Sequence, residues 1–409
     1  MNYATQSVVV GSDLDCARVD SSESPLRIGI NLLFLIPGGV GGTEIFARNL
    51  LLALAEFDHV NQYFVFRNNE TEPGIVPDQS NFIDCPQRVH ATFRPARIIY
   101  EQTLLVVAIM RRKLDVVLNA GYTAPLLCTV PMVTVSYDLH YKVHPENFRA
   151  IDLLFWRILL PASAHRSTRL VTMSEAARRQ LEEHYGWYDR PIDVVPHGIE
   201  ARFEAIARAR GANPARERFI LAVSTLGPNK NYDCLLRAYK RFHRNRPDIR
   251  LVIVGIKGSQ SDALVALREE LGLNDAVTFT GWIPREDLYQ LYEDALAFVY
   301  PSKFEGFGIP VLEAIAAGIP TACSAIPSLD EIAARCARFF DPNDVEDLEL
   351  ALREITAPTA SQGATIAIGR ERAQAFGWKH SAVKLLNSLR SAASTTRSRT
   401  GPSLERHSL

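Results

Sequence analysis

The stretch from residue 296 to residue 318 constrains the fold more than any other part of this sequence. It opens with an apolar run that ends at Tyr300, and such a run is typical of a strand buried within a parallel sheet. A loop with two glycines follows, and then Pro310, which suits the first turn of a helix because proline lacks only an N–H that would be unpaired there. The order strand, glycine loop, helix predicts an α/β protein in which this loop can touch a ligand.

Two carboxylates accompany this loop, Glu305 within it and Glu313 about one turn inside the helix. They flank one small volume from different elements, and a carboxylate can accept from the neighbouring hydroxyl groups that a sugar or a ribose presents. The first turn of the helix can bind an anion at the same place. A plain strand, turn and helix with packing glycines and solvated glutamates would explain the same residues, so the residues alone leave both interpretations open.

Length and composition describe a globular protein with more than one domain. A chain of 409 residues exceeds what a single core usually covers, so we expect two domains. Hydrophobic residues make up 47% and charged residues 22%, which is typical of soluble globular chains. The net charge of -1 argues against a general nucleic-acid binder.

The cysteines and the chain ends predict a cytoplasmic protein. Six cysteines lie scattered without a Cys-x-x-Cys pair, which indicates reduced, mostly buried thiols. Residues 1–24 lack the basic start and apolar centre of a signal peptide, and no apolar stretch reaches the length of about 20 residues that a membrane span needs. We expect residues 1–24 and the Ser-, Thr- and Arg-rich tail 391–409 to be disordered.

The nine residues 305–313, which begin and end with a glutamate, resemble the signature of retaining nucleotide-sugar glycosyltransferases with the GT-B fold, in the large family 4. Further segments in family order extend the resemblance over most of the chain. It implies an α/β fold of two doubly wound, Rossmann-like domains that face a central cleft. Residues 25–200 would form the acceptor-side domain and residues 201–375 the nucleotide-sugar-binding domain, and a terminal helix at 376–390 would cross back to the first domain.

A glycine-rich turn at residues 37–42 separates a predicted strand at 27–34 from a predicted helix at 43–56. Dinucleotide binding is the competing interpretation, but the turn does not keep Gly-x-Gly-x-x-Gly spacing. The family that the chain resembles carries a glycine-rich loop here that faces the cleft. We therefore assign Gly41 and Gly42 to the cleft.

Tyr137, Asp138 and His140 follow a predicted strand at residues 132–136, at the end where ligands of open parallel sheets bind. The segment resembles the family's His-Asp-Leu stretch, whose histidine approaches the donor sugar, but Tyr137 occupies the usual histidine position. Either His140 supplies the missing imidazole or the Tyr137 hydroxyl binds the sugar. Asp138 is predicted to accept from a sugar hydroxyl, or to cap the following turn.

Lys230 lies in the turn between a predicted strand at 219–223 and a predicted helix at 232–242. It matches the family's diphosphate-binding lysine, whose ammonium adds a point charge to the N–H groups of a helix terminus. Many family members carry an arginine a few residues earlier, where this sequence has Ser224 and Thr225. The missing charge must be met by backbone donors, by a hydroxyl such as that of Thr225, or by another basic residue.

The remaining donor contacts that the resemblance implies are made by the backbone. Gly306, Phe307, Gly308 and Ile309 would offer donors to the sugar or the phosphate, and the backbone near Ile283 would contact the nucleobase. The ring of the preceding tryptophan is expected to serve packing rather than base stacking.

The resemblance implies a retaining glycosyltransferase that moves a hexose, mannose as a first guess, from a nucleoside diphosphate sugar to an acceptor hydroxyl. Glu305 would hold the donor sugar and Glu313 the ribose, with Asp138 and His140 as further catalytic candidates. No metal, other cofactor or covalent intermediate is expected, because Lys230 and the helix terminus can meet the charge of the leaving diphosphate. The competing interpretations are a GT-B-shaped sugar-nucleotide epimerase and a degenerate, non-catalytic sugar-nucleotide-binding module.

The expected acceptor is a glycan or lipid-linked glycan of bacterial polysaccharide or glycolipid assembly. Such an acceptor favours peripheral contact with the inner face of the membrane through basic and aromatic residues near 94–100, although these can equally form a solvated face.

We also expect a helix at 98–110, an N-cap at Ser174, and an irregular charged stretch at 200–218 that contains the domain boundary.

Overall fold

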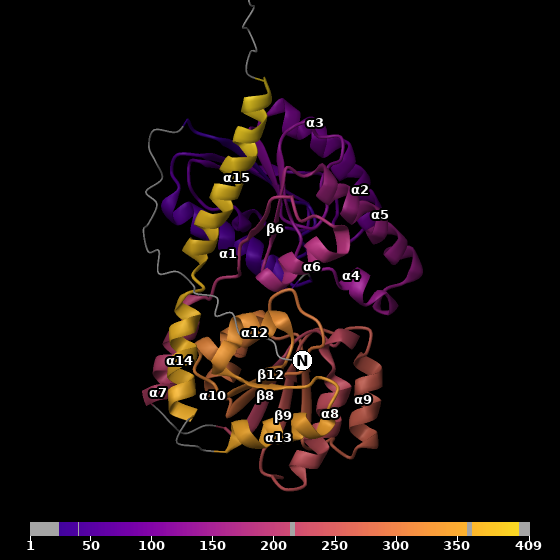
Figure 1. The fold of residues 1–409 in the computed structure, drawn as a ribbon, viewed down its shortest axis with the longest axis vertical. Helices are drawn as coiled ribbons and strands as arrows, with labels where there is room; N and C mark the ends of the chain where they lie inside the picture. Colours follow the sequence, from indigo (N-terminus) through magenta and orange to yellow (C-terminus); the bar gives the residue numbers. More distant parts are fainter. Residues whose placement is uncertain (1–23, 40, 213–216, 358–361, 401–409) are drawn as a thin grey trace, which may run out of the picture.

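The computed structural model describes residues 24–39, 41–212, 217–357 and 362–400. Within them the chain forms two separate parallel β-sheets, each covered by helices, and the two layered units lie one above the other in Figure 1. The prediction of an α/β protein with two doubly wound domains is therefore confirmed.

The first sheet has seven strands in the order β3-β2-β1-β4-β5-β6-β7. β1 is the third strand in this order and pairs in parallel with β2 and β4. The inner strands are nearly uniform apolar runs, as expected of strands that are covered by helices on both faces. The strand bounds are β1 Arg27–Leu32, β2 Gln62–Arg67, β3 Phe82–Pro86, β4 Val116–Asn119, β5 Met132–Val135, β6 Arg169–Thr172 and β7 Ile192–Val194.

The second sheet has six strands in the order β10-β9-β8-β11-β12-β13, again all parallel. β11 is the strand that the sequence predicted from its apolar run, and its four residues are all buried. The strand bounds are β8 Phe219–Val223, β9 Arg250–Val254, β10 Val277–Gly281, β11 Ala297–Tyr300, β12 Thr321–Ser324 and β13 Arg338–Phe340.

Helices connect the strands and cover both faces of each sheet (Figure 1). In the first unit they are α1 Gly42–Phe57, α2 Arg94–Gln102, α3 Leu104–Arg111, α4 His140–Val143, α5 Ala150–Arg166 and α6 Glu175–Tyr185. In the rest of the chain they are α7 Ala201–Ala212, α8 Tyr232–His243, α9 Ser261–Glu270, α10 Arg285–Asp294, α11 Ile309–Ala316, α12 Pro327–Ala333, α13 Val345–Thr356, α14 Gln362–Gln374 and α15 Trp378–Thr400.

Two expectations about helices were wrong in the middle of the chain. The helix expected at 98–110 is broken at Thr103, whose backbone leaves the helical region and whose hydroxyl donates to the carbonyl of Ile99 at 2.7 Å. The stretch expected to be irregular, 200–218, contains α7, because Phe203 and Ile206 give it an apolar side that is buried. The N-cap at Ser174 is confirmed, since its side chain accepts from the N–H of Ala177.

The expectation of a disordered tail from residue 391 was also wrong for residues 391–400, because α15 continues through them. This helix crosses back over the first unit and packs on α1 (Figure 1). Its apolar stripe of Ala382, Leu385 and Leu389 is fully buried, which holds the helix there. Residues 1–23 and 401–409, for which disorder was also expected, lie outside the described residues.

The two units touch directly at the ends of their strands. The hydroxyl of Ser174 donates to the carbonyl of Gly306 at 2.7 Å, and an alanine at position 306 would place its Cβ 2.1 Å from the carbonyl oxygen of Tyr137. The carboxylate of Glu331 accepts from the N–H groups of Glu175 and Ala176, at 3.0 and 3.1 Å, which is a favourable place for an anion because it is a helix N-terminus. The close approach of the two units at this point therefore needs a glycine at position 306.

The cysteines of the described chain are unpaired and buried, as predicted: Cys85, Cys128, Cys234, Cys323 and Cys336. Cys16 lies outside the described residues. None of the helices in the described ranges combines the length and the apolar character that a membrane crossing requires.

Candidate functional site

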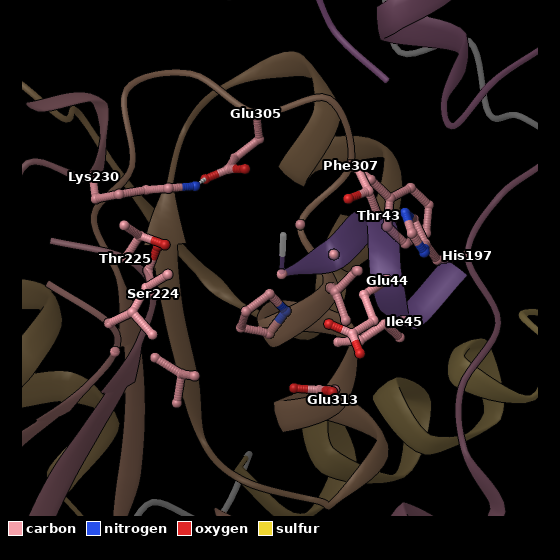
Figure 2. Close-up of a pocket in the computed structure, with 18 of the residues that line it drawn as sticks. Thr43, Glu44, Ile45, His197, Ser224, Thr225, Lys230, Glu305, Phe307 and Glu313 are labelled. Carbon is pink, nitrogen blue, oxygen red and sulfur yellow. Dashed lines mark hydrogen bonds and ion pairs between the residues drawn. The ribbon is translucent and has the colours of Figure 1, made fainter. Parts of the chain in front are cut away.

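A cleft of about 590 Å³ lies between the two units, at the carboxyl ends of their strands. Its walls come from the start of α1 and the segment after β5 on one side. On the other side they come from the turns after β8, β9, β10 and β11 and from the first turn of α11. Figure 2 shows Lys230 and Glu305 facing each other at one side of this cleft and Glu313 at another. Ligands of open α/β sheets bind at this end of the strands.

The loop between β11 and α11 brings the predicted contact residues into the cleft wall. Gly306, Phe307, Gly308 and Ile309 all line it. Gly308 has a φ of 118°, and a Cβ there would lie 2.4 Å from a side-chain carbon of Leu329, so only glycine suits this turn. α11 then begins with no side-chain cap at its N-terminus.

Lys230 and Glu305 form an ion pair within the cleft, with 2.5 Å between Nζ and Oε1 (Figure 2). The hydroxyl of Tyr300, at the end of β11, donates to the same carboxylate oxygen at 2.8 Å. Burial, together with the negative charge of Glu305, holds the pKa of Tyr300 well above its usual value, so this hydroxyl keeps its proton. The carboxylate of Glu305 is thus held between a cation and a neutral donor.

Glu313 is buried, with only 3% of its surface exposed, and it is fully paired. Arg285 at the start of α10 approaches one carboxylate oxygen to 2.5 Å, and the hydroxyl of Tyr292 donates to the other at 2.8 Å. Arg285 also pairs with Glu200 at 3.0 Å. Burial alone would lower the pKa of Arg285, but the two carboxylates outweigh it and raise that pKa.

Asp138 lines the cleft, whereas His140 is not among the residues that line it. The Asp138 carboxylate accepts from the backbone N–H of His140 at 3.0 Å, so it caps the turn as one of the two interpretations expected. Burial raises the pKa of Asp138 above its ordinary value. The His140 ring stacks on Phe304 with centroids 5.6 Å apart and meets the amide of Asn147 at 3.0 Å. The structure does not bring His140 into the set of residues that line the cleft.

Tyr137 lines the cleft with its ring, but its hydroxyl donates to the backbone carbonyl of Ala120 at 2.8 Å. The side chain is 6% exposed. The proton of this hydroxyl is therefore used in a hydrogen bond within the first unit, and the Tyr137 hydroxyl does not donate to a sugar in this arrangement.

His197 is the cleft residue that the sequence reasoning missed. It lies in the segment that passes from β7 to α7, and in Figure 2 it stands beside Phe307, with 5.2 Å between ring centroids. It is 3% exposed, its Nδ1 has no hydrogen-bond partner among the described residues, and burial lowers its pKa to about 3. In the sequence, the Pro-His-Gly segment at 196–198 resembles the crossover into the second domain, and no local pattern marks the imidazole as part of a site.

The other predicted contacts lie at the rim. Thr225 is exposed at the turn after β8, and Gly41 and Gly42 form the start of α1, where Gly41 has a φ of 55°. Ile283 follows β10 and is partly buried, but the preceding Trp282 is 63% exposed and also lines the cleft. An exposed indole at the cleft is not a packing residue, so that expectation was wrong.

The cleft walls contain few cations in the described part of the chain, namely Lys230 and Arg285. Arg285 is held by two carboxylates, which leaves Lys230 as the cation nearest the loop before α11. The described residues also contain no cluster of three or more histidine, cysteine, aspartate or glutamate side chains placed to hold a metal ion.

Comparison with known proteins gives matches over nearly the whole chain. Residues 40–203 match the family described as Glycosyltransferase Family 4, and residues 204–372 match the Glycosyl transferases group 1 family. The chain is similar to the O-antigen chain mannosyltransferase B of Escherichia coli, with 32% identity over 62% of this chain and 69% of that protein. It is 28% identical to the O-antigen chain mannosyltransferase RfbU of Salmonella typhimurium, over 58% of this chain and 64% of that protein.

Among solved structures, the fold is similar to that of a sucrose-phosphate synthase from Thermosynechococcus elongatus, with a TM-score of 0.73. The superposition covers 91% of this chain and all of that chain, at 21% sequence identity. The likeness confirms the GT-B architecture.

Proposed function

The chain belongs to the group 1 and family 4 glycosyltransferases, and on that premise we propose that it moves a hexose, with mannose as the first candidate, from a nucleoside diphosphate sugar to an acceptor hydroxyl with retention of configuration. The acceptor would be a glycan or lipid-linked glycan of bacterial polysaccharide or glycolipid assembly. The mannosyltransferase names of two similar proteins support the choice of sugar. The alignments leave about a third of each of these proteins uncovered.

One observation carries the proposal: Glu305 and Glu313 lie in the wall of one cleft with Lys230 close to the first and Arg285 close to the second. A nucleoside diphosphate sugar carries hydroxyl groups at both ends and a dianion between them. We therefore place the ribose at Glu313, the diphosphate at Lys230 and the start of α11, and the sugar beside Glu305 and Asp138. Residues 25–200 would then form the acceptor side and residues 201–375 the donor side.

The residues of the chain act mainly on the charge of the leaving group. In the structure, the Lys230 ammonium is paired with Glu305. When the bond between the anomeric carbon and the diphosphate breaks, Lys230 and the N-terminus of α11 stabilise the negative charge that develops. The acceptor oxygen bonds to the anomeric carbon on the same face, and its proton passes to the leaving phosphate. This mechanism needs no metal and no covalent intermediate.

We further propose that His197 supplies the imidazole that the family carries at the position of Tyr137. Both rings line the cleft, and their centroids are 6.4 Å apart. The imidazole of His197 therefore reaches the region of Tyr137 from a different segment of the chain. Since its pKa is about 3, the ring is neutral at physiological pH and can donate from one nitrogen and accept at the other. His140 remains the alternative that the sequence predicted.

The test of His197 is a pH profile of kcat for His197→Gln and His140→Gln. The first is expected to lose at least tenfold in kcat and the second to stay within about threefold, because one hydrogen bond to a reacting group contributes roughly 1.4 kcal/mol. The neutral imidazole proposed here would be contradicted if the pH profile of kcat has an inflection near pH 6.5 in the native protein and in His140→Gln, but not in His197→Gln.

We also propose peripheral membrane contact by the outer faces of α2, α3 and α5, which lie together at one side of the first unit (Figure 1). These faces expose large apolar side chains next to basic ones, the combination that binds an anionic lipid surface. The exposed apolar residues are Phe93, Ile99, Leu104, Val107, Met110, Ile151, Leu154 and Ile158. The test is co-sedimentation with vesicles of phosphatidylcholine, with and without phosphatidylglycerol, using Ile99→Asp/Ile158→Asp; equal sedimentation of that variant would contradict the proposal.

The donor is tested by thermal unfolding in the presence of GDP, UDP, ADP and their sugar conjugates. A ligand that binds only the folded state raises the melting temperature by mass action. We expect one base to raise it in the native protein and not in Lys230→Met, while Lys303→Met, which removes an exposed lysine of the neighbouring loop, keeps the shift. No shift with any nucleotide would overturn the donor assignment and favour a non-catalytic module. Transfer to an acceptor would in turn exclude that module and an epimerase.

A further inference from the structure

A second cavity of about 410 Å³ lies in the first unit next to the donor cleft. Its walls include the start of α2, a residue of α5 and the segments that follow β1 and β4. Thr43 and Tyr122 line both cavities, so the two spaces share a wall at these residues. A molecule bound in the second cavity is therefore next to the place where the donor sugar is expected.

Arg97 is the residue that points to a ligand. It lines this cavity, only 6% of its surface is exposed, and its guanidinium has no hydrogen-bond partner among the described residues. Burial lowers its pKa, and the charge of Glu101 only partly opposes this shift. An arginine stays protonated in proteins, and a buried cation without a partner is unfavourable, so the cavity lacks an anion that would pair with it.

Arg94 adds a second guanidinium to the same wall. It stacks over the ring of Trp156, 5.0 Å from the centroid, and shares an ion pair with Asp152 at 3.0 Å. α2 begins at this residue with no side-chain cap, so the helix terminus adds partial positive charge. Two guanidinium groups and a helix N-terminus suit an anion with several oxygens.

Two acids lie close to this cavity, and one of them keeps an unpaired oxygen: Oε1 of Glu101 has no hydrogen-bond partner among the described residues. Glu70 accepts from the backbone N–H and the hydroxyl of Thr92. Glu101 is fully buried and accepts from the hydroxyl of Thr123 at 2.9 Å, and burial raises its pKa to about 7. Neither carboxylate forms an ion pair with Arg97 in the described part of the chain, and the charge of Glu101 compensates that of Arg97 only in part, so part of the positive charge is left for a bound anion.

Tyr122, in the shared wall, has a φ of 50°, which is rare for a bulky side chain. A backbone held in this region tends to occur at functional sites, because the surrounding structure must maintain it. Here it holds the tyrosine ring between the second cavity and the cleft that contains Asp138.

We propose that the second cavity binds a phosphate group of the acceptor, with Arg97 and Arg94 as its ligands. This inference rests on the proposed glycosyltransferase function, which it deepens by naming the acceptor as a phosphate-bearing molecule. Bound there, the phosphate fixes the acceptor on the first unit and places an adjoining hydroxyl beyond Tyr122, on the side of the donor sugar.

The test is calorimetric titration of the full chain with inorganic pyrophosphate in the Lys230→Met background, which removes the cation of the donor cleft. Lys230→Met is expected to keep one pyrophosphate site, and Lys230→Met/Arg97→Met to bind at least tenfold more weakly. Arg111→Met in the same background removes an exposed arginine of α3 and serves as the matched control, with binding unchanged. Arg97→Lys keeps the positive charge and is expected to keep part of the affinity for pyrophosphate. It therefore separates the loss of the charge from a folding defect.

Pyrophosphate binding that Arg97→Met leaves intact, or that Lys230→Met alone abolishes, would overturn the proposal. Two further arms separate the sources of the phosphate: a soluble hexose 1-phosphate, and phosphatidylcholine vesicles that carry a polyprenyl diphosphate. Binding of either one that depends on Arg97 supports the site and identifies its source, and binding of neither one counts against it. Binding of a nucleoside diphosphate is measured alongside, in the native protein and in Arg97→Met, both of which keep Lys230. If neither of these two proteins binds the nucleotide, the donor assignment is refuted instead.

Discussion

Replacing Glu305 with glutamine is expected to tighten the binding of a nucleoside diphosphate while it slows transfer. In the structure, Lys230 is 2.5 Å from the Glu305 carboxylate, and the two side chains are only 17% and 12% exposed. A diphosphate that binds Lys230 must draw the ammonium away from this partner and also come close to a negative charge. Glu305→Gln removes the charge but keeps the shape and an oxygen that can accept from Tyr300.

The expected gain in affinity follows from the contact between Lys230 and Glu305 that the nucleoside diphosphate has to replace. A hydrogen bond to a charged group contributes about 1.5–3 kcal/mol, and the glutamine oxygen retains part of it. A net gain of about 1.4 kcal/mol is therefore reasonable, which corresponds to roughly tenfold tighter binding. Turnover should fall about 100-fold, because Glu305 is proposed to hold the sugar at the reacting carbon.

Calorimetry with the nucleoside diphosphate found in the thermal screen measures the affinity. Glu44→Gln is the matched control, because Glu44 lines the same cleft but pairs with Arg48 at 2.8 Å instead of Lys230. An equal gain in Glu44→Gln would show a general effect of charge. Unchanged or weaker binding by Glu305→Gln, or a gain that survives in Lys230→Met, would refute the competition between carboxylate and diphosphate.

Three further predictions concern the contact between the two units and the stability of the chain. Gly306→Ala should lower kcat at least tenfold with an unchanged fold by circular dichroism, since its Cβ would lie 2.1 Å from the carbonyl oxygen of Tyr137; wild-type kcat would contradict this contact. Glu313→Ala should destabilise the chain by about 3 kcal/mol in urea unfolding, because it leaves the Arg285 charge and a tyrosine hydroxyl short of a partner, and an unchanged midpoint would disprove the pair. Burial alone would raise the pKa of Asp193, but hydrogen bonds from an arginine of β6 and a serine of α15 hold it below its usual value. Its stabilisation is therefore present above about pH 4 and lost as the pH falls further, and Asp193→Asn should flatten this part of the stability profile measured by thermal unfolding.

The strands and the central loop could be predicted from the sequence because their signals are local. The apolar runs around Phe298 and Leu221 predict buried strands by composition alone, and the positions of the glycines and of Pro310 predict the turn into α11. The family resemblance rested on the same short stretches, so the fold class, the enzyme class and the facing of Glu305 toward a cleft followed from them.

Other features depended on where remote segments meet. Arg285 and Glu313 are 28 residues apart in sequence, and their pairing depends on how α10 and α11 both pack on α7. The sequence marks His197 only as part of a crossover; its burial among the rings of Phe46, Phe307 and Trp378 requires three separate segments to converge. The sequence by itself thus determined the two sheets and the loop that carries the glutamates. Only the tertiary structure decided which cations pair with those glutamates and which imidazole lines the cleft, because burial and pairing are properties of contacts between distant residues.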